Sequence, residues 1–172
     1  MTLSRRMVVR RLGGPEVLEV EEGPMPAPGK SEVRIRVEAA GVAYGDIMRR
    51  RGVIAVRRPF SPGYDVVGVV DAVGSAADSS LMGTRVGAIL STIGTGGYTE
   101  HLCVSAERIV RVPDGVDAVE AVGLGLNYIT AVQILHGICG VRVGESVLVH
   151  GASGGVGTAL VDVAVAAGAV VW

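Results

Sequence analysis

Aromatic side chains are scarce in this 172-residue chain, where phenylalanine, tryptophan and tyrosine together make up 3% of the residues. An excess of charge is missing too, because 16 basic and 17 acidic residues give a formal net charge of −1 at pH 7. Nucleic-acid-binding surfaces are basic and often interleaved with aromatic residues, and anionic membranes attract clusters of basic residues. We therefore expect neither nucleic acid nor a membrane as a partner.

Cysteines and long apolar runs are also few. The two cysteines, Cys103 and Cys139, lie far apart and form no CxxC motif, so they predict neither a disulfide framework nor a zinc site. No apolar run approaches the length of a membrane span, and the N-terminus lacks the apolar core of a signal peptide. These absences favour a cytoplasmic protein.

Short strand-like segments fill the first part of the chain. Residues 32–38 alternate strictly, with Val33, Ile35 and Val37 on one face, which is the pattern of a half-buried strand. Turns rich in glycine and proline separate it from similar segments. Strands are expected at residues 7–10, 18–21, 32–38, 66–73, 85–90, 97–104 and 109–112, with one or two helical turns at residues 43–51. This spacing predicts a domain like a β-barrel over residues 1–120.

The pattern changes in residues 121–172. A short helix that Asp117 and Glu120 can cap is followed by apolar residues at helical spacing over residues 127–139. An apolar strand at residues 146–150, a glycine-rich turn and an apolar helix come next. This order is typical of the start of a dinucleotide-binding domain.

The glycine-rich turn reads Ala152-x-Gly154-x-x-Gly157, with alanine at the place of the usual first glycine. Glycines allow a tight turn and let the backbone approach a pyrophosphate, whose charge then lies at the positive N-terminus of the helix. The residues expected to contact the cofactor are Ala152, Ser153, Gly154, Gly155, Val156 and Gly157.

Five segments along the chain carry a family resemblance when they are taken in order. They are Gly13–Leu18, Val37–Val42 with Asp46, Pro62–Gly68, Leu126–Ala131 and Gly144–Gly157. Together they resemble the zinc-independent quinone oxidoreductase branch of the medium-chain dehydrogenase/reductase superfamily. The resemblance implies a GroES-like β-barrel domain followed by the opening β-α-β of an incomplete Rossmann domain, a fold between α+β and α/β. It also implies NADPH-dependent reduction of quinones or enones in a cleft between the two domains.

The resemblance further implies chemistry without a metal. Where zinc-dependent relatives have a cysteine ligand this chain has Ala43 or its neighbours, and their Gly-His-Glu becomes Gly63-Tyr64-Asp65. A tetrahedral zinc site needs Cys and His ligands that these positions lack. Hydride addition to an enone then needs a hydroxyl or amide donor for the developing enolate, and solvent or a tyrosine can deliver the proton.

Two residues near the start of a predicted helix are the catalytic candidates. Tyr44 is the expected hydroxyl donor, and the alternative is a packing tyrosine whose hydroxyl reaches solvent. Asp46 matches an aspartate of the family and either takes part in the reaction or anchors its loop through backbone hydrogen bonds. Relatives often have asparagine at the position of Ala43, so its loss removes a polar donor from the expected site.

Two polar residues in the second half are expected at the nicotinamide end of the cofactor, again by resemblance. These are Asn127 and Thr130, for which helix capping and hydrogen bonding to the preceding helical turn are the alternatives. Relatives usually have tyrosine where this chain has Val132. The residue that distinguishes NAD from NADP lies roughly 20 residues after the first glycine position, which is where the chain ends.

Three hypotheses for the function remain open. In the first, the chain is part of an NADPH-dependent reductase of a small hydrophobic carbonyl compound or quinone. In the second, it is a short, cofactor-free isomerase or cyclase on a truncated reductase scaffold. In the third, it is a non-catalytic interaction subunit. The helix after the glycine turn is apolar all round, and such a helix has to be covered on several sides. Either the rest of a Rossmann domain or another chain covers it, and for the second case we expect a homodimer.

Overall fold

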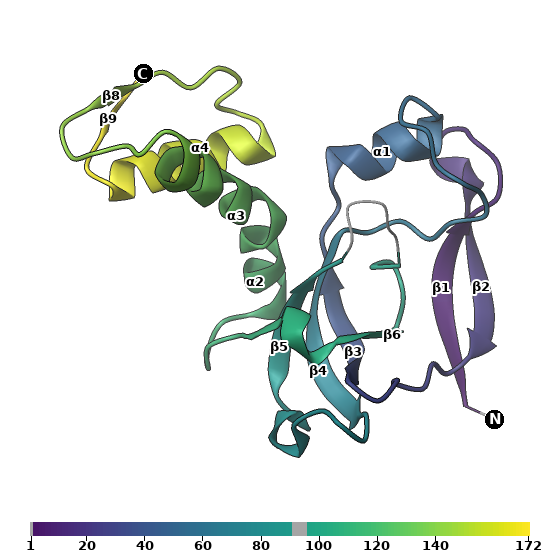
Figure 1. Cartoon of the computed structure of the whole chain (residues 1–172). Helices are drawn as coiled ribbons and strands as arrows, with labels where there is room; N and C mark the ends of the chain where they lie inside the picture. Colours follow the sequence, from purple (N-terminus) through teal and green to yellow (C-terminus); the bar gives the residue numbers. More distant parts are fainter. Residues whose placement is uncertain (1, 91–95) are drawn as a thin grey trace. The chain divides into compact units, whose positions relative to one another are not determined.

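The computed structural model describes residues 2–90 and 96–172 (Figure 1). Its internal contacts divide the chain into two compact units, which we call unit 1 (Met1–Val122) and unit 2 (Gly123–Trp172). Antiparallel strands dominate unit 1, whereas helices around a short parallel strand pair form unit 2.

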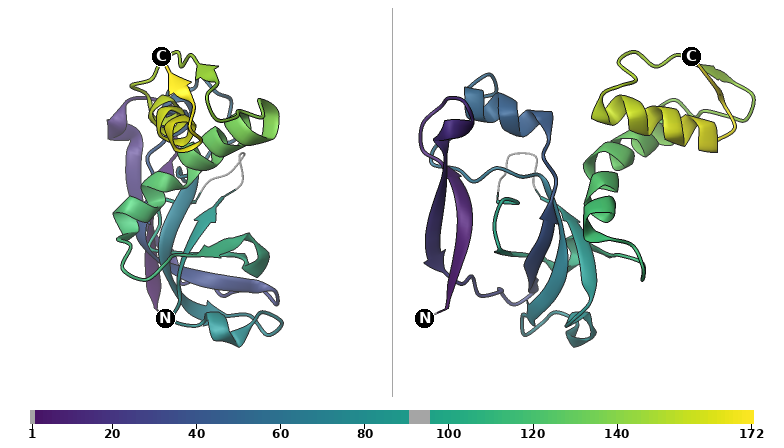
Figure 2. Two further views of the ribbon diagram at one scale, coloured as in Figure 1. Left: turned by 90° about the vertical axis from the view of Figure 1, so that its left-hand side faces the viewer. Right: turned by 180° about the vertical axis from the view of Figure 1, so that it is seen from behind.

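Unit 1 begins with an antiparallel hairpin. Strands β1 (Leu3–Val9) and β2 (Leu18–Pro24) pair along their whole length, and a 3₁₀ turn, η1 (Pro15–Val17), precedes β2. Proline is favoured at the first position of such a turn because its φ is already helical and it needs no N–H partner there. The hairpin expected around the Gly-Gly-Pro segment is confirmed (Figure 2).

A five-stranded antiparallel sheet with the order β6-β3-β4-β5-β7 forms the rest of unit 1. Its strands are β3 (Glu32–Ala40), β4 (Asp65–Val73), β5 (Arg85–Ile89), β6 (His101–Ser105) and β7 (Ile109–Arg111). Val33 and Ile35 of β3 are fully buried and pack with Val66 and Val70 of β4. The strict alternation of residues 32–38 therefore marks the core face of this sheet, as predicted.

The two sheets of unit 1 are open, and isolated bridges rather than continuous pairing join them. Arg6 bridges to Thr99, and Val9 bridges to Phe60. The strand expected at residues 97–104 begins only at His101, because Gly97 and Tyr98 direct their backbone N–H groups to Gly63 and Pro62 instead. The predicted barrel is thus two open sheets, with short bridges from the hairpin to residues just outside the strands of the larger sheet.

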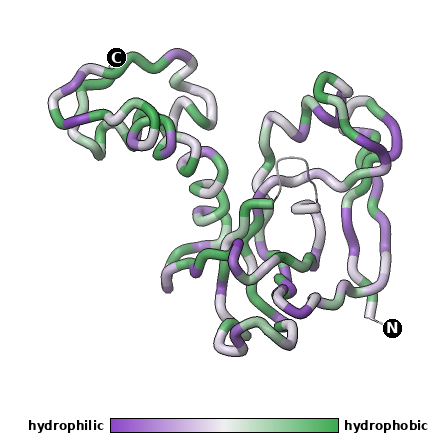
Figure 3. Tube along the Cα trace, viewed as in Figure 1, coloured by the Kyte–Doolittle hydropathy of each residue, from purple (hydrophilic) through white to green (hydrophobic). Residues whose placement is uncertain are grey.

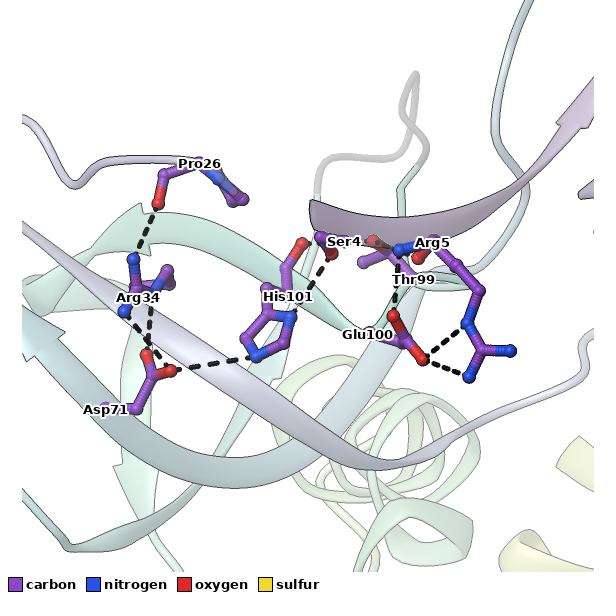
Figure 4. A network of polar contacts seen from close by, with 8 residues as sticks. All are labelled: Ser4, Arg5, Pro26, Arg34, Asp71, Thr99, Glu100 and His101. Carbon is purple, nitrogen blue, oxygen red and sulfur yellow. Dashed lines mark hydrogen bonds and ion pairs between the residues drawn. The ribbon is translucent and has the colours of Figure 1, made fainter. Parts of the chain in front are cut away.

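Polar side chains add to the connection between the hairpin and the sheet (Figure 4). The Ser4 hydroxyl on β1 lies 3.2 Å from Nδ1 of His101, whose Nε2 lies 3.7 Å from Asp71. Arg34 donates to the same carboxylate at 2.7 Å, and Arg5 pairs with Glu100. His101 therefore has a structural role, as a partner of groups on both sheets.

Short helices complete unit 1. They are α1 (Tyr44–Arg51), η2 (Ser79–Leu81), η3 (Ala106–Arg108) and α2 (Ala118–Leu124), which reaches into unit 2. Asp117 accepts the N–H of Val119 at 2.8 Å and so caps the start of α2. Ala118 and Val122 pack against Val67 of β4, which explains why this short helix is held on the sheet.

Unit 2 contains the opening β-α-β that the sequence predicts. It consists of α3 (Leu126–Val132), the π-helical η4 (Gln133–Ile138), β8 (Ser146–Val147), α4 (Gly155–Ala166) and β9 (Val170–Val171). Strands β8 and β9 are parallel, with α4 as the crossover between them. The first strand is shorter than the expected residues 146–150, although Val149 still donates to the Trp172 carbonyl at 2.9 Å.

Most apolar side chains of unit 2 are not buried, unlike those of the strands in unit 1. The helical spacing at residues 127–139 indicated a buried face, yet Ile129, Val132 and Ile138 are exposed and only Leu135 of that set is buried. Two short strands offer too little surface to cover the helices on more than one side. The hydropathy colouring shows hydrophobic stretches along these helices (Figure 3).

One expectation about apolar runs needs correction. The consecutive helices at Ala118–Ile138 span 21 residues and contain a window with a mean hydropathy of 1.4, which is long and apolar enough to cross a membrane by length and composition. A core helix of a larger domain passes the same test, so this alone is weak evidence for a membrane span.

Candidate functional site

Asp46 connects the start of α1 to the loop that precedes β4. One carboxylate oxygen accepts the N–H of Ala43 at 3.1 Å, and the other accepts the N–H of Gly63 at 2.9 Å. The residue is only 5% exposed, so these bonds compensate for the burial of its charge. This is the loop-anchoring role that the sequence left open beside a catalytic one.

Tyr98 is a third partner of this carboxylate, and its hydroxyl donates to Asp46 at 3.3 Å. Burial and the neighbouring negative charge of Asp46 raise the pKa of the Tyr98 phenol above its ordinary value. The hydroxyl therefore keeps its proton and its donor role across the physiological pH range. Sequence reasoning missed Tyr98, because nothing local links it to a residue 52 positions earlier.

The loop carrying Gly63 also packs backbone to backbone against Gly97. Gly63 has φ +103°, and a Cβ there would lie 2.6 Å from the Gly97 Cα. Such a contact admits no side chain at residue 63. Asp46, Tyr98 and this glycine contact thus hold three segments of unit 1 together: the first turn of α1, the loop before β4 and residues 96–98.

Two tyrosine side chains border the first turn of α1. Tyr44, the predicted donor, is 71% exposed. The half-buried Tyr64 lies with its ring 4.7 Å from the Arg49 guanidinium and its hydroxyl close to Gly45. The structure leaves the catalytic role of Tyr44 a prediction and adds Tyr64, which the sequence had presented only as the residue in place of a zinc ligand.

Four charged residues are buried around this turn: Asp46, Arg49, Arg50 and Asp65. Arg50 donates to the carbonyl of Gly13 at 2.7 Å and so connects α1 to the hairpin. Buried charges are costly unless they are paired or hydrogen-bonded. The four buried charges are two of each sign, so they balance one another in number.

The glycine-rich turn of unit 2 is tightly folded. Gly154 donates its N–H to the Gly151 carbonyl at 3.0 Å, and the Thr158 hydroxyl donates to the Ala152 carbonyl at 3.2 Å. A Cβ at Gly157 would lie 2.1 Å from the Gly151 oxygen, so only glycine allows α4 to pack on this turn. The first N–H groups of an α-helix have no partner within the helix, and the first two here belong to the exposed residues Gly155 and Val156.

Asn127 is the predicted site residue that unit 2 brings to the glycine turn. A Cβ added at Gly155 would lie 2.7 Å from the Asn127 amide nitrogen, so the amide rests on the first residue of α4. The Thr130 hydroxyl instead donates to the Leu126 carbonyl at 2.7 Å, which is the bond to the preceding turn that the sequence allowed as an alternative. The nicotinamide role of both residues stays a prediction.

Tyr128 and Asp162 connect α3 to α4 beside this turn. The Tyr128 hydroxyl donates to Asp162 at 2.5 Å, and this hydrogen bond raises the pKa of the Tyr128 phenol. The single charge of α4 is therefore engaged within unit 2. Within residues 2–90 and 96–172, no three His, Cys, Asp or Glu side chains are placed to hold a metal ion together.

Unit 1 is thus an antiparallel β unit, and unit 2 is a β-α-β with a glycine-rich turn between its first strand and its helix, which is how a dinucleotide-binding fold begins. The alcohol dehydrogenase GroES-like domain matches residues 29–114. The chain belongs to this family.

Similar sequences include quinone oxidoreductases. The human protein is 38% identical over 170 residues, which cover 96% of this chain and 51% of that protein. The protein from Lama guanicoe is 39% identical over 166 residues, covering 94% of this chain and 49% of its own length. The chain thus spans about half the length of the curated relatives that it matches.

Solved structures agree on the fold. The human synaptic vesicle membrane protein VAT-1 homolog-like protein superposes with a TM-score of 0.92 at 32% identity, covering 99% of this chain and 55% of that one. A quinone oxidoreductase from Pseudomonas syringae gives 0.88 at 32% identity, over 98% and 51%. A mycobacterial protein in complex with NADPH gives 0.87 at 34% identity, over 97% and 51%. The GroES-like unit followed by a partial Rossmann unit is confirmed.

Proposed function

We propose that the complete protein carrying this chain is an NADPH-dependent reductase of quinones or of alkenes conjugated to a carbonyl. The observation that carries the proposal is the glycine turn of unit 2, which has the required glycine at position 157 and the Asn127 amide on Gly155. Quinone oxidoreductase relatives and an NADPH complex of a relative at 34% identity support it.

The residues of the turn fit a dinucleotide. The exposed backbone of residues 151–156 leads into a 12-residue helix, α4, whose N-terminus favours a pyrophosphate. Asn127 offers an amide beside that helix start, suited to orienting a polar group of the cofactor. Bound NADPH supplies the hydride, and this chain supplies the binding and the polar contacts.

For the substrate, a hydroxyl donor takes the place of a metal. Tyr44, on the first turn of α1, would donate to the carbonyl oxygen as negative charge develops on it, while solvent delivers the proton to carbon. Zinc independence is part of the proposal, because the positions matched to zinc ligands hold Ala43 and Tyr64. Asp46 then contributes by fixing the turn that carries Tyr44.

The remaining expectations are proposals of the same kind. The substrate is a small hydrophobic carbonyl compound or quinone, the protein is cytoplasmic, and neither nucleic acid nor a membrane is its partner. The exposed apolar side chains of unit 2 support a homodimer or further covering segments of the same polypeptide.

The first test is titration of the protein with NADPH and NADH, followed by calorimetry or nicotinamide fluorescence. We expect NADPH binding in the micromolar range, abolished by Gly157→Ala because the added Cβ would collide with the Gly151 carbonyl. Gly137→Ala is the matched control, since a Cβ there meets nothing within 4 Å. A folded complete protein that binds neither nucleotide would refute the proposal and favour a cofactor-free isomerase or cyclase.

A further inference from the structure

The phenol of Tyr64 is a polar group whose position is fixed by the described part of unit 1. No hydrogen bond joins its hydroxyl to another described residue. Ser61 has the one buried side-chain oxygen without a partner in the described ranges, so the Tyr64 hydroxyl keeps access to solvent. A free phenol that is positioned yet reachable can donate to a bound ligand.

Contacts on three sides hold the Tyr64 side chain and its backbone. The Arg49 guanidinium lies over the ring at 4.7 Å from its centre, a stabilising cation–π arrangement. The preceding Gly63 is bonded to Asp46, and the Tyr64 carbonyl accepts the N–H of Leu90 at 2.6 Å. The ring position is therefore set by the fold before any ligand binds, which is the requirement for a preorganised donor.

Gly45 determines where the hydroxyl lies. A Cβ at this residue would come within 2.5 Å of the Tyr64 oxygen, so the phenol occupies space that any other residue would take. Gly45 directly follows Tyr44 in the first turn of α1. Two phenols, one exposed and one half-buried, therefore border the same turn.

We propose that Tyr64 is a catalytic hydroxyl donor that hydrogen-bonds the substrate carbonyl oxygen, together with or instead of Tyr44. The inference rests on the proposed reductase function. In the reaction, a hydride forms a C–H bond at the β-carbon of the enone and the C=C electron pair moves to give an enolate. The Tyr64 O–H donates to the enolate oxygen without losing its proton, and solvent protonates the α-carbon. The enone is reduced, and NADPH is oxidised to NADP⁺.

The test compares Tyr64→Phe and Tyr44→Phe in the complete protein. Phenylalanine keeps the ring that Arg49 contacts, so loss of the hydroxyl is isolated from loss of packing. We expect Tyr64→Phe to lower kcat/KM for an enone by about 10²-fold, the usual effect of removing one such donor, with the dissociation constant of NADPH unchanged. Gly23→Ala on β2 is a control in unit 1, because a Cβ there meets nothing within 4 Å, and it should keep wild-type turnover.

A second variant and a binding measurement make the test independent of turnover. Gly45→Ala should also lower kcat/KM by displacing the hydroxyl, whereas Gly123→Ala, with nothing within 4 Å of its Cβ, should not. Calorimetry with a 1,3-diketone, whose enolate carries charge where the transition state does, should show weaker binding to Tyr64→Phe than to wild type.

The outcomes separate this inference from the proposed function. A wild-type protein that reduces enones while Tyr64→Phe keeps its kcat/KM and its diketone affinity would overturn the role of Tyr64 alone. A wild-type protein that reduces neither enones nor quinones would contradict the proposed function, and equal diketone binding by the two proteins would then overturn the inference as well.

Discussion

Units 1 and 2 differ in how far their apolar side chains are buried. In unit 1, Val33, Ile35 and Val86 are fully buried between strands that lie far apart in the sequence. In unit 2, Ile138 is 79% exposed and Val165 is 59% exposed. Burial of apolar area is the main source of folding free energy. The comparison indicates that unit 1 carries its own core, whereas the helices of unit 2 leave apolar side chains exposed.

The largest effect should come from the core of unit 1. Ile35→Ala removes a fully buried side chain from the centre of the five-stranded sheet, and we expect it to lower the free energy of unfolding by about 2–5 kcal/mol. Ile138→Ala changes a side chain that is mostly in contact with solvent and should cost less than about 0.5 kcal/mol. Chemical denaturation of both variants measures the difference.

An equal decrease in the free energy of unfolding for the two substitutions would contradict the difference in burial between the units. They would mean that Ile138 is covered in solution by another chain or another segment. A large loss for Ile138→Ala that depends on protein concentration would identify a second copy as the cover.

Sequence patterns predicted the elements of both units but the burial of only one. Alternation at Val33 and Ile35 identifies a core face, because a strand in a sheet always has two different faces. Helical spacing at Ile129 and Val132 identified a helix correctly, but their burial depends on what packs against that helix. The periodicity of apolar residues predicts a helix or a strand, but it does not predict which other segments pack against it.

The candidate site shows the same limit. The sequence offered Asp46 either as a catalytic group or as an anchor, and only the fold shows that its partners are Gly63 and Tyr98. The glycine turn was recognisable because its requirement is local, as the Gly157 contact with Gly151 demonstrates. Tyr64 could not be recognised, since its position depends on Arg49 and Gly45 of another segment.

A moderate effect is expected on self-association. Val165 is exposed on α4, so a lysine there should disrupt any contact that covers this helix and raise the dissociation constant of a dimer about tenfold or more. Val110→Lys is the control, because Val110 is 71% exposed on β7 in unit 1. Light scattering over a range of concentrations measures both. A wild-type chain that stays monomeric throughout would contradict the proposed homodimer.

The smallest expected effect concerns Tyr98, a phenol that unit 1 holds against the buried Asp46 carboxylate. The folded state raises the pKa of Tyr98, whereas the unfolded chain has the ordinary value of about 10. Above that pH the unfolded state loses a proton that the folded state retains, so the free energy of unfolding falls as pH rises. The stabilisation that the protonated Tyr98 contributes is fully present below that pH.

Tyr98→Phe should remove this alkaline loss of stability, whereas Tyr44→Phe, at an exposed position, should leave it intact. Denaturation at a series of pH values measures it, and an unchanged alkaline slope in Tyr98→Phe would show that the Asp46 contact does not hold the phenol protonated. Unit 2 offers the sharper contrast, because Tyr128 donates to the exposed Asp162, where solvent screens the charge and the same substitution should change the slope less.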